Sequence, residues 1–286
     1  MPKLTLADLS TPHNPTWCPG CGDFSIWGSI KNALVELQLD PDNTVIVYGI
    51  GCSGNMCNTI NTYGFHGLHG RALPVAEGIK LSNHKLTVIA VVGDGDQYGE
   101  GMNHLIHACR GNHDITCIVH DNEVYGLTTG QVSPTAETGH KSKSTPEGII
   151  ETPVNPLGVA ISSGASFVAR SATVKPIHLK DTIVKAIQHK GFSLVDVLQN
   201  CPSFNKYNTH EFYQEVVYEM NMKDTSDKVK AFSKIWEWGP KIPIGVFYED
   251  LKKPTYEDKL PQLKTNSLVN KTVKVQNIDK LLSQFR

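Results

Sequence analysis

Short apolar runs alternate with amphipathic segments along roughly the first two thirds of the chain. The runs have the length and residue types of buried strands, and they cover residues 45–48, 86–92, 115–119, 167–169 and 193–198. Segments with apolar residues at helical spacing lie between them, at 24–37, 74–82, 103–110, 158–163 and 176–189. Strands that alternate with helices are typical of a parallel sheet covered on both faces. The pattern therefore predicts an α/β fold with a doubly wound, mostly parallel sheet.

The two ends of the chain depart from this pattern. Residues 1–22 are rich in Pro, Thr and Gly and are predicted to form an irregular arm. Beyond residue 206 we expect one helix over 210–220, followed by charged, Pro-containing segments. We therefore divide the chain into an N-terminal arm (1–22), an α/β domain (23–206) and a C-terminal extension (207–286). The extension either packs on a partner subunit or an edge of the sheet, or forms a loosely ordered tail.

The composition limits the classes of protein to which the chain can belong. Hydrophobic residues make up 40% of the sequence and charged residues 19%, with a net charge of −1. This balance describes a soluble globular protein without a basic surface for nucleic acid or an anionic membrane. No apolar run approaches the ~18 residues that cross a bilayer, and the opening MPKLTLADLS lacks a secretory apolar core. A cytoplasmic location is expected.

Acidic and amide side chains follow two neighbouring predicted strands. Gly93-Asp94-Gly95-Asp96 comes directly after the run that ends at residue 92, and Asn122 follows the next run, 28 positions after Asp94 (122 − 94). That separation fits one strand–helix–strand unit, in which the carboxyl ends of parallel strands lie side by side. Oxygen ligands of this kind suit Mg²⁺ bound together with phosphates. The alternative is that these are ordinary turn dipeptides.

Four of the seven cysteines lie where they could converge on one metal centre. They are Cys18 and Cys21 of a C-x₂-C pair in the arm, and Cys52 and Cys201 at the ends of two strands. Four thiolates can hold a [4Fe–4S] cluster or a structural Zn²⁺, and the spacing alone does not choose between them. The other three cysteines are expected to be structural, since two of them lie in a helix and an apolar strand.

Six blocks of the sequence resemble the β subunit of 2-oxoacid:ferredoxin oxidoreductases, which bind thiamine diphosphate. They are TWCPGCG (16–22), GIGCS (49–53), TYGFHGLHGRALPVAEGIKL (62–81), GDGD (93–96), DNEVYGLTTGQ (121–131) and DVLQNCPSFN (196–205). Their order and number make the match far more specific than a single Gly-rich loop. The resemblance is nearest to the 2-oxoglutarate type, and it implies a diphosphate-type thiamine-diphosphate-binding domain.

The resemblance also implies a set of site residues. Mg²⁺ would be bound by Asp94, Asn122 and the backbone carbonyl of Val124. The cofactor would be contacted by Ile50, Gly51, Cys52, Ser53, His69, Gly95, Asp96, Gly126 and Leu127. One [4Fe–4S] cluster would be ligated by Cys18, Cys21, Cys52 and Cys201.

The activity implied is coenzyme A-dependent oxidative decarboxylation of a 2-oxo acid, most closely 2-oxoglutarate to succinyl-CoA, or the reverse carboxylation. Electrons would pass from the thiamine-diphosphate enamine through the cluster to ferredoxin. The chain has one plausible diphosphate domain and no second domain of similar size to supply the activating glutamate. We therefore assign no catalytic residue here and expect an α subunit to complete the site, in a heterotetramer.

Three alternatives remain. Many relatives carry Lys or Arg two positions beyond the Ser of GIGCS, but this chain has Asn55, so pyruvate or a broad range of 2-oxo acids stays open. A non-redox thiamine-diphosphate enzyme would need the acidic motif but leaves the four cysteines unexplained. A zinc-stabilised scaffolding subunit would explain the cysteines but not the acidic motif.

Overall fold

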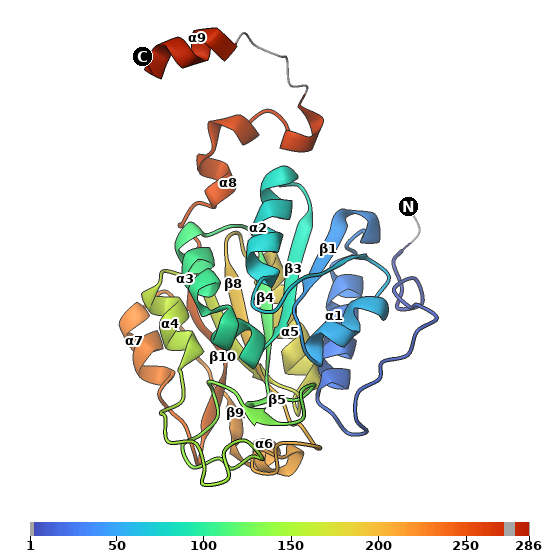
Figure 1. Cartoon of the computed structure of the whole chain (residues 1–286), viewed down its shortest axis with the longest axis vertical. Helices are drawn as coiled ribbons and strands as arrows, with labels where there is room; N and C mark the ends of the chain where they lie inside the picture. Colours follow the sequence, from blue (N-terminus) through green and yellow to red (C-terminus); the bar gives the residue numbers. More distant parts are fainter. Residues whose placement is uncertain (1–2, 272–277, 286) are drawn as a thin grey trace.

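An eight-stranded sheet forms the centre of the computed structural model, which describes residues 3–271 and 278–285 (Figure 1). The strand order is β2 (Tyr63–His66), β1 (Thr44–Tyr48), β3 (Thr87–Gly93), β4 (Thr116–Asp121), β8 (Ser193–Leu198), β7 (Phe167–Ala172), β10 (Ile242–Glu249) and β9 (Val217–Glu219). All neighbouring strands are parallel except β10, which runs antiparallel to β7. The predicted fold class is confirmed.

Helices cover both faces of the sheet. One face carries α1 (Asp23–Glu36) and α5 (Pro176–Gln188), and the other carries α2 (Ala72–Ser82), α3 (Met102–Gly111), α4 (Pro156–Ser162) and α7 (Lys228–Lys234). In β3, Val88, Ala90 and Val92 pack into the second layer, while Ile89 and Val91 pack into the first. Because successive side chains of a strand alternate between faces, burial on both sides makes the strand an unbroken apolar run.

The remaining described elements are short. They are η1 (Pro41–Asn43), η2 (Ser53–Asn58), η3 (Gly95–Glu100, a π-helical turn), β5 (Val124–Tyr125), β6 (Gln131–Val132), α6 (His210–Val216), α8 (Tyr256–Lys259), η4 (Pro261–Leu263), η5 (Leu268–Asn270), α9 (Ile278–Leu282) and η6 (Ser283–Phe285). In the described residues, no helix combines the length and hydropathy that a membrane-spanning segment needs.

Two parts of the predicted extension join the sheet. The helix expected over 210–220 is wrong at its end, because α6 stops at Val216 and the chain continues as β9. The β-branched Val216 and Val217 favour extended backbone, and pairing with β10 buries both side chains. Strand β10 was not predicted, since Pro243 and Gly245 interrupt its apolar run.

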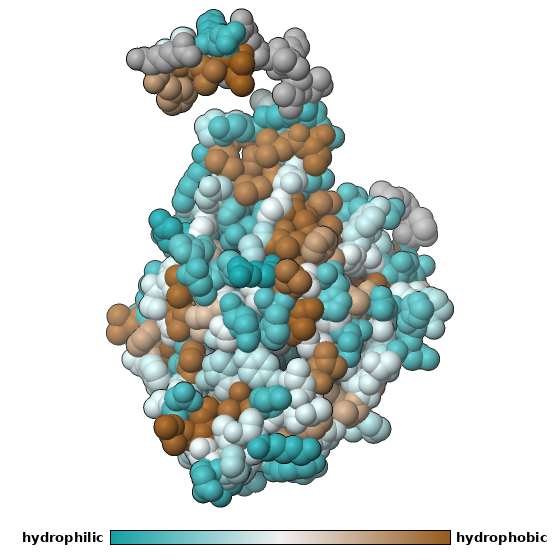
Figure 2. Space-filling view, viewed as in Figure 1, coloured by the Kyte–Doolittle hydropathy of each residue, from teal (hydrophilic) through white to brown (hydrophobic). Residues whose placement is uncertain are grey.

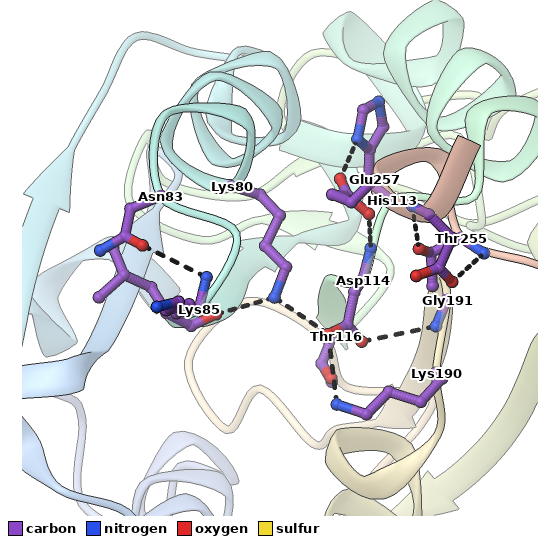
Figure 3. Close-up of polar contacts among 12 residues, drawn as sticks. Lys80, Asn83, Lys85, His113, Asp114, Thr116, Lys190, Gly191, Thr255 and Glu257 are labelled. Atoms are coloured by element: carbon purple, nitrogen blue, oxygen red, sulfur yellow. Dashed lines mark hydrogen bonds and ion pairs between the residues drawn. The ribbon is translucent and has the colours of Figure 1, made fainter. Parts of the chain in front are cut away.

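After β10, the segment around Glu257 packs against residues 112–114, which precede β4 at the amino edge of the sheet (Figure 3). The Nδ1 atom of His113 lies 2.6 Å from Oε1 of Glu257, and the backbone N–H of Asp114 donates to Oε2 of Glu257 at 3.2 Å. Asn112, in the left-handed conformation with φ 64°, donates from Nδ2 to the carbonyl of Pro254 at 3.0 Å. Beyond this anchor, α9 lies apart from the sheet (Figure 1).

Hydrophobic side chains are exposed on the last part of the extension. Val269 is 62% exposed, Ile278 65% and Phe285 89%. In Figure 2, hydrophobic residues gather at this end of the molecule, above the body that contains the sheet. This surface is consistent with packing on another subunit, which stays a prediction.

The His113–Glu257 contact predicts a pH-dependent contribution to stability. Burial alone would raise the pKa of Glu257, but the hydrogen bond from His113 and those from backbone N–H groups outweigh it and lower the pKa. Ionised Glu257 therefore stabilises the fold above its unfolded pKa of about 4.3, and this contribution is lost as the pH falls through the lower folded pKa. We expect Glu257→Gln to reduce the free energy of unfolding at pH 7 by about 1–3 kcal/mol.

Denaturant unfolding at pH 7 and at pH 3.5 measures the effect, with Glu147→Gln, at an exposed position, as the control. The difference between wild type and Glu257→Gln should shrink at the lower pH. A variant as stable as wild type at pH 7 would show that this contact does not hold the extension.

Candidate active site

A pocket lies at the carboxyl ends of β1, β3 and β4. It is lined by Ile50, Gly51, Cys52, Ser53, His69, Gly93, Asp94, Gly95, Asp96, His120, Asn122, Val124, Tyr125, Gly126, Leu127 and Thr128. The nine residues predicted to contact a cofactor and the three predicted to bind Mg²⁺ are all among them. The fold therefore brings together predicted residues that are as much as 77 positions apart (127 − 50).

The carboxylate of Asp94 is held by three donors. Its Oδ2 atom accepts hydrogen bonds from the backbone N–H of Glu123 at 2.7 Å, from Oγ of Ser133 at 2.7 Å and from Oγ1 of Thr135 at 3.1 Å. Burial raises the pKa of Asp94, although these donors oppose that effect. Sequence reasoning missed Ser133 and Thr135, which follow the β5–β6 hairpin. In the sequence, only the two hydroxyl residues on either side of Pro134 could have indicated this role.

The side chain of Asn122 has a fixed orientation. Its Oδ1 atom accepts from the backbone N–H of Val124 at 3.1 Å, and its Nδ2 atom donates to Oε1 of Gln199 at 3.3 Å. Glu123, between them, takes the left-handed conformation with φ 63°. This tight turn returns the backbone to the pocket, so that Asn122 and Val124 both line it.

Two glycines keep side chains out of the pocket. A Cβ atom on Gly95 would lie 2.4 Å from the ring of Tyr125, and one on Gly126 would lie 3.3 Å from Sγ of Cys52. Only residues without a side chain allow this approach of backbone to neighbouring groups. Tyr125 and Cys52 line the same pocket, so the two glycines let the backbone pack closely against its walls.

Buried polar atoms at the pocket lack protein partners. Oγ of Ser53, Oδ2 of Asp96 and Nε2 of His120 are buried without a hydrogen bond among the described residues. Oδ1 of Asp96 accepts from the backbone N–H of Gly70 at 2.7 Å and lies 2.7 Å from Nδ1 of His69. Buried polar atoms are nearly always satisfied in folded proteins, so these three indicate room for a polar ligand.

Two of the four cysteines predicted to bind metal lie beside Gly126, which lines the pocket. A Cβ atom on Gly126 would lie within 3.9 Å of Sγ of both Cys52 and Cys201, so these two sulfurs lie close together. Cys21 is buried at the start of α1, and Cys18 is exposed. Burial raises the pKa of Cys21, Cys52 and Cys201, to about 12 for Cys52.

Within the described residues, no three His, Cys, Asp or Glu side chains are close enough to hold a single metal ion. His66, Cys57, Cys109 and Cys117 do not line the pocket. Cys109 and Cys117 are fully buried in the hydrophobic core, as expected for structural thiols.

A second cavity of about 180 Å³ lies on the other side of Thr135 and Asp121. Its walls are mostly apolar and include Trp236 and Trp238, whereas Arg170 pairs through Nε with Asp196 at 3.0 Å. None of the predicted site residues lines it. The predicted cofactor and Mg²⁺ residues therefore line the pocket at the carboxyl ends of β1, β3 and β4 and not this cavity.

Two protein families match the chain. The family described as thiamine pyrophosphate enzyme, C-terminal TPP binding domain, covers residues 49–197, which include the pocket. The family that describes the C-terminal part of the pyruvate ferredoxin oxidoreductase β chain covers residues 201–265. The α/β domain is therefore a thiamine-pyrophosphate-binding domain.

The relatives identify the chain more closely. The β subunit of a 2-oxoacid:ferredoxin oxidoreductase from Saccharolobus solfataricus is 46% identical over 279 residues, which cover 93% of this chain and 91% of that protein. The 2-oxoglutarate synthase protein KorB from Archaeoglobus fulgidus is 40% identical over 78% of this chain and 84% of its own length. The chain belongs to the β subunits of 2-oxoacid:ferredoxin oxidoreductases, which confirms the resemblance found in the sequence.

A solved structure agrees with this assignment. The 2-oxoglutarate:ferredoxin oxidoreductase from Magnetococcus marinus, with 2-oxoglutarate, coenzyme A and succinyl-CoA bound, matches with a TM-score of 0.91. The match is 34% identical in sequence and covers all of this chain and 97% of the other. The similarity thus includes the C-terminal residues that add β9 and β10.

The close approach of Gly95 to Tyr125 predicts an effect on stability. We expect Gly95→Ala to lower the free energy of unfolding by about 1–3 kcal/mol, because the new methyl group must displace the Tyr125 ring. Gly28→Ala is the matched control. Nothing lies within 4 Å of its Cβ position in α1, so a gain of about 0.5–1 kcal/mol is expected. Equal thermal midpoints for the two variants would contradict the tight fit at Gly95.

Proposed function

We propose that this chain holds thiamine diphosphate through Mg²⁺ at the pocket and passes electrons to a [4Fe–4S] cluster on Cys18, Cys21, Cys52 and Cys201. One observation carries the proposal. The predicted cofactor and Mg²⁺ residues line a single pocket, and Cys52 belongs both to that lining and to the cysteine set. The two groups would therefore be neighbours.

The Mg²⁺ assignment is supported by the hydrogen bonds of its ligands. Three donors hold Oδ2 of Asp94, which orients the whole carboxylate toward the pocket. Asn122 and Val124 supply an amide and a carbonyl oxygen, the hard ligands that Mg²⁺ takes together with phosphate oxygens and water. The backbone of Gly95 and Gly126 lines the same pocket, where a diphosphate could approach it.

The cluster assignment is supported by the interactions among the cysteines. Cys52 and Cys201 both lie beside Gly126. After burial, the charges of Cys201 and Cys18 help to raise the pKa of Cys52, and that of Cys201 helps to raise the pKa of Cys21, so the four thiols interact with one another. When bound, thiamine diphosphate supplies an electron sink that lets a 2-oxo acid lose CO₂, and the cluster accepts electrons one at a time. The chain's own residues position the groups and exclude water.

The substrate proposed is 2-oxoglutarate, with coenzyme A as the acyl acceptor. The Magnetococcus marinus enzyme has 2-oxoglutarate, coenzyme A and succinyl-CoA bound, and it resembles this chain along its whole length. Pyruvate or a broad range of 2-oxo acids is the alternative, because Asn55 in η2 offers a hydrogen bond but no positive charge. Most of the anchoring of the substrate carboxylate would then come from the partner.

As a β subunit, the chain works with an α subunit, which we propose supplies the activating glutamate in a heterotetramer. The edge strand β2 next to the pocket exposes apolar side chains, with Tyr63 61% exposed, Phe65 47% and Leu68, just beyond the strand, 76%. Exposed apolar groups at a sheet edge are typical of surfaces that another chain covers. Ferredoxin is proposed as the acceptor of the electrons.

The proposal predicts the metal content of the purified complex. After anaerobic co-purification with its α subunit, we expect about four irons and four sulfides per β chain and one thiamine diphosphate per αβ pair. Cys52→Ser should lose most of the iron and sulfide. Cys57→Ser should keep them, because Cys57 lies outside the pocket. Zinc without iron or sulfide would rule out the electron-transfer role.

The substrate assignment predicts an effect at position 55. Asn55→Lys adds a positive charge beside GIGCS, and a charge-assisted hydrogen bond to a substrate carboxylate is worth about 1.5–3 kcal/mol. We therefore expect at least a tenfold change in the ratio of kcat/KM for 2-oxoglutarate to that for pyruvate. Asn55→Gln, which adds length without charge, is the control. An unchanged ratio in Asn55→Lys would remove this residue from substrate selection.

A further inference from the structure

Gln199 lies between the two proposed cofactor sites. It follows β8 directly, its side chain is fully buried, and its backbone N–H donates to the carbonyl of Asp121 at 2.8 Å. Neither the acidic motif nor the cysteine pattern drew attention to it, because it is an uncharged residue at the end of an apolar strand. Its position in the fold nevertheless places it against both sites.

The carboxamide of Gln199 bonds to a proposed ligand of each metal centre. Its Nε2 atom donates to Sγ of Cys21 at 3.3 Å, and its Oε1 atom accepts from Nδ2 of Asn122 at 3.3 Å. The direction of both bonds follows from the partners. Turning the carboxamide over would place two N–H donors against each other at Asn122 and would leave Cys21 without its donor.

These bonds decide how Asn122 faces the pocket. Because Nδ2 of Asn122 is used by Gln199, its Oδ1 atom is the one that remains on the side of Val124. A carbonyl oxygen can accept one bond from the N–H of Val124 and still offer a second lone pair to a cation. Without Gln199, the carboxamide of Asn122 could rotate and present its N–H group to the cation.

The local backbone holds Gln199 in place. A Cβ atom on Gly22 would lie 2.6 Å from Cγ of Gln199, so only glycine at position 22 leaves room for this side chain. The next residue, Asn200, binds the same loop, because its Nδ2 atom donates to the carbonyl of Gly20 at 2.9 Å. The backbone N–H of Gly22 donates in turn to the carbonyl of Asn200 at 3.2 Å. The C-x₂-C loop therefore packs against the residues that follow β8 and is hydrogen-bonded to them.

The bond to Cys21 gains importance when the cysteine binds metal. As a thiol, Cys21 donates to Oδ2 of Asp23 at 3.1 Å, but a ligating thiolate has no proton to donate. The N–H of Gln199 would then donate to a charged sulfur, and hydrogen bonds to charged groups are the stronger ones. Hydrogen bonds to the sulfurs favour the reduced, more negative cluster and so raise its reduction potential.

We propose that Gln199 is a positioning residue that joins the two centres, orienting Asn122 toward Mg²⁺ through Oε1 and donating to the cluster ligand Cys21 through Nε2. The proposal rests on the proposed function, since it needs the cation at Asn122 and the cluster at Cys21. It adds a role for one buried amide in setting both the affinity for Mg²⁺ and the potential of the cluster.

Two substitutions separate the two bonds. Gln199→Leu removes both the donor and the acceptor, whereas Gln199→Met keeps a weak acceptor, its thioether sulfur, and loses the donor to Cys21 without adding charge. Thr173→Val is the matched control, because Thr173 packs against the same Gly22 but bonds to Asn200 rather than to either centre. Each variant is made in the αβ complex and purified anaerobically.

The measurements are the midpoint potential of the cluster, from a redox titration followed by electron paramagnetic resonance, and the Mg²⁺ concentration needed for half-maximal binding of thiamine diphosphate. For Gln199→Leu we expect a lower potential, by about 59 mV for a tenfold change in a one-electron equilibrium. We also expect about tenfold weaker Mg²⁺ binding, as is usual when a residue that orients a metal ligand is lost. Gln199→Met should lower the potential about as much as Gln199→Leu, with a smaller effect on the Mg²⁺ requirement.

The outcomes distinguish this proposal from the proposed function. A wild-type complex without cluster or thiamine diphosphate would overturn the proposed function itself. A loaded wild type, with Gln199→Leu equal to Thr173→Val in potential and in Mg²⁺ requirement, would overturn only the role of Gln199. If Gln199→Leu does not fold, the potential and Mg²⁺ requirement of Gln199→Met decide, and an unchanged potential in that variant contradicts the donated bond to Cys21.

Discussion

Parallel pairing of β1, β3, β4 and β8 is the constraint on which the site depends. Since parallel strands all end at the same edge of a sheet, the loops that follow these four strands are neighbours. β1 leads into Cys52, β3 into Asp94, β4 into Asn122, and β8 into Gln199 and Cys201. The four loops are distant from one another in sequence. The parallel pairing of these strands is enough to bring the four loops together at one site.

The same edge concentrates buried carboxyl groups, which is costly in a protein interior. Burial, with the nearby carboxylates of Glu137 and Asp94, raises the pKa of Glu123 to about 8, and burial also raises the pKa of Asp94. For Asp121 the pKa is raised by burial first and then by the neighbouring carboxylates of Asp196 and Asp94. Positive charge nearby would offset the cost of burying these carboxylates. The divalent cation proposed at Asp94 would supply such a charge.

The sequence predicted most of the sheet because its strands are continuous apolar runs buried on both faces, as in β3 and β4. It failed where a strand is not apolar on both sides. The four residues of β2 are all exposed, and β10 contains Pro243. It also missed the change from helix to strand after Val216, where pairing of β9 with β10 outweighs helix propensity.

At the site, residue types and motifs identified the residues whose own chemistry is proposed to bind a ligand. The residues that hold those ligands were not predictable, because their roles arise from position alone. Ser133, Thr135 and Gln199 are ordinary polar residues until the fold brings them to Asp94, Asn122 and Cys21. Their hydrogen bonds depend on the angle at which loops leave separate strands, and no local pattern encodes that angle.

The pocket and the contacts of the C-terminal segment lie at opposite ends of the strands. The carboxyl edge leaves polar atoms such as Ser53 Oγ without partners among the described residues, as a ligand site requires. At the amino edge, in contrast, Asn112, His113 and Asp114 bond to the C-terminal segment around Glu257 and satisfy the polar groups there (Figure 3). Because β10 runs antiparallel to β7, it carries the chain from the carboxyl edge to the amino edge. Strand β10 thus anchors the C-terminal segment at the edge of the sheet opposite the pocket.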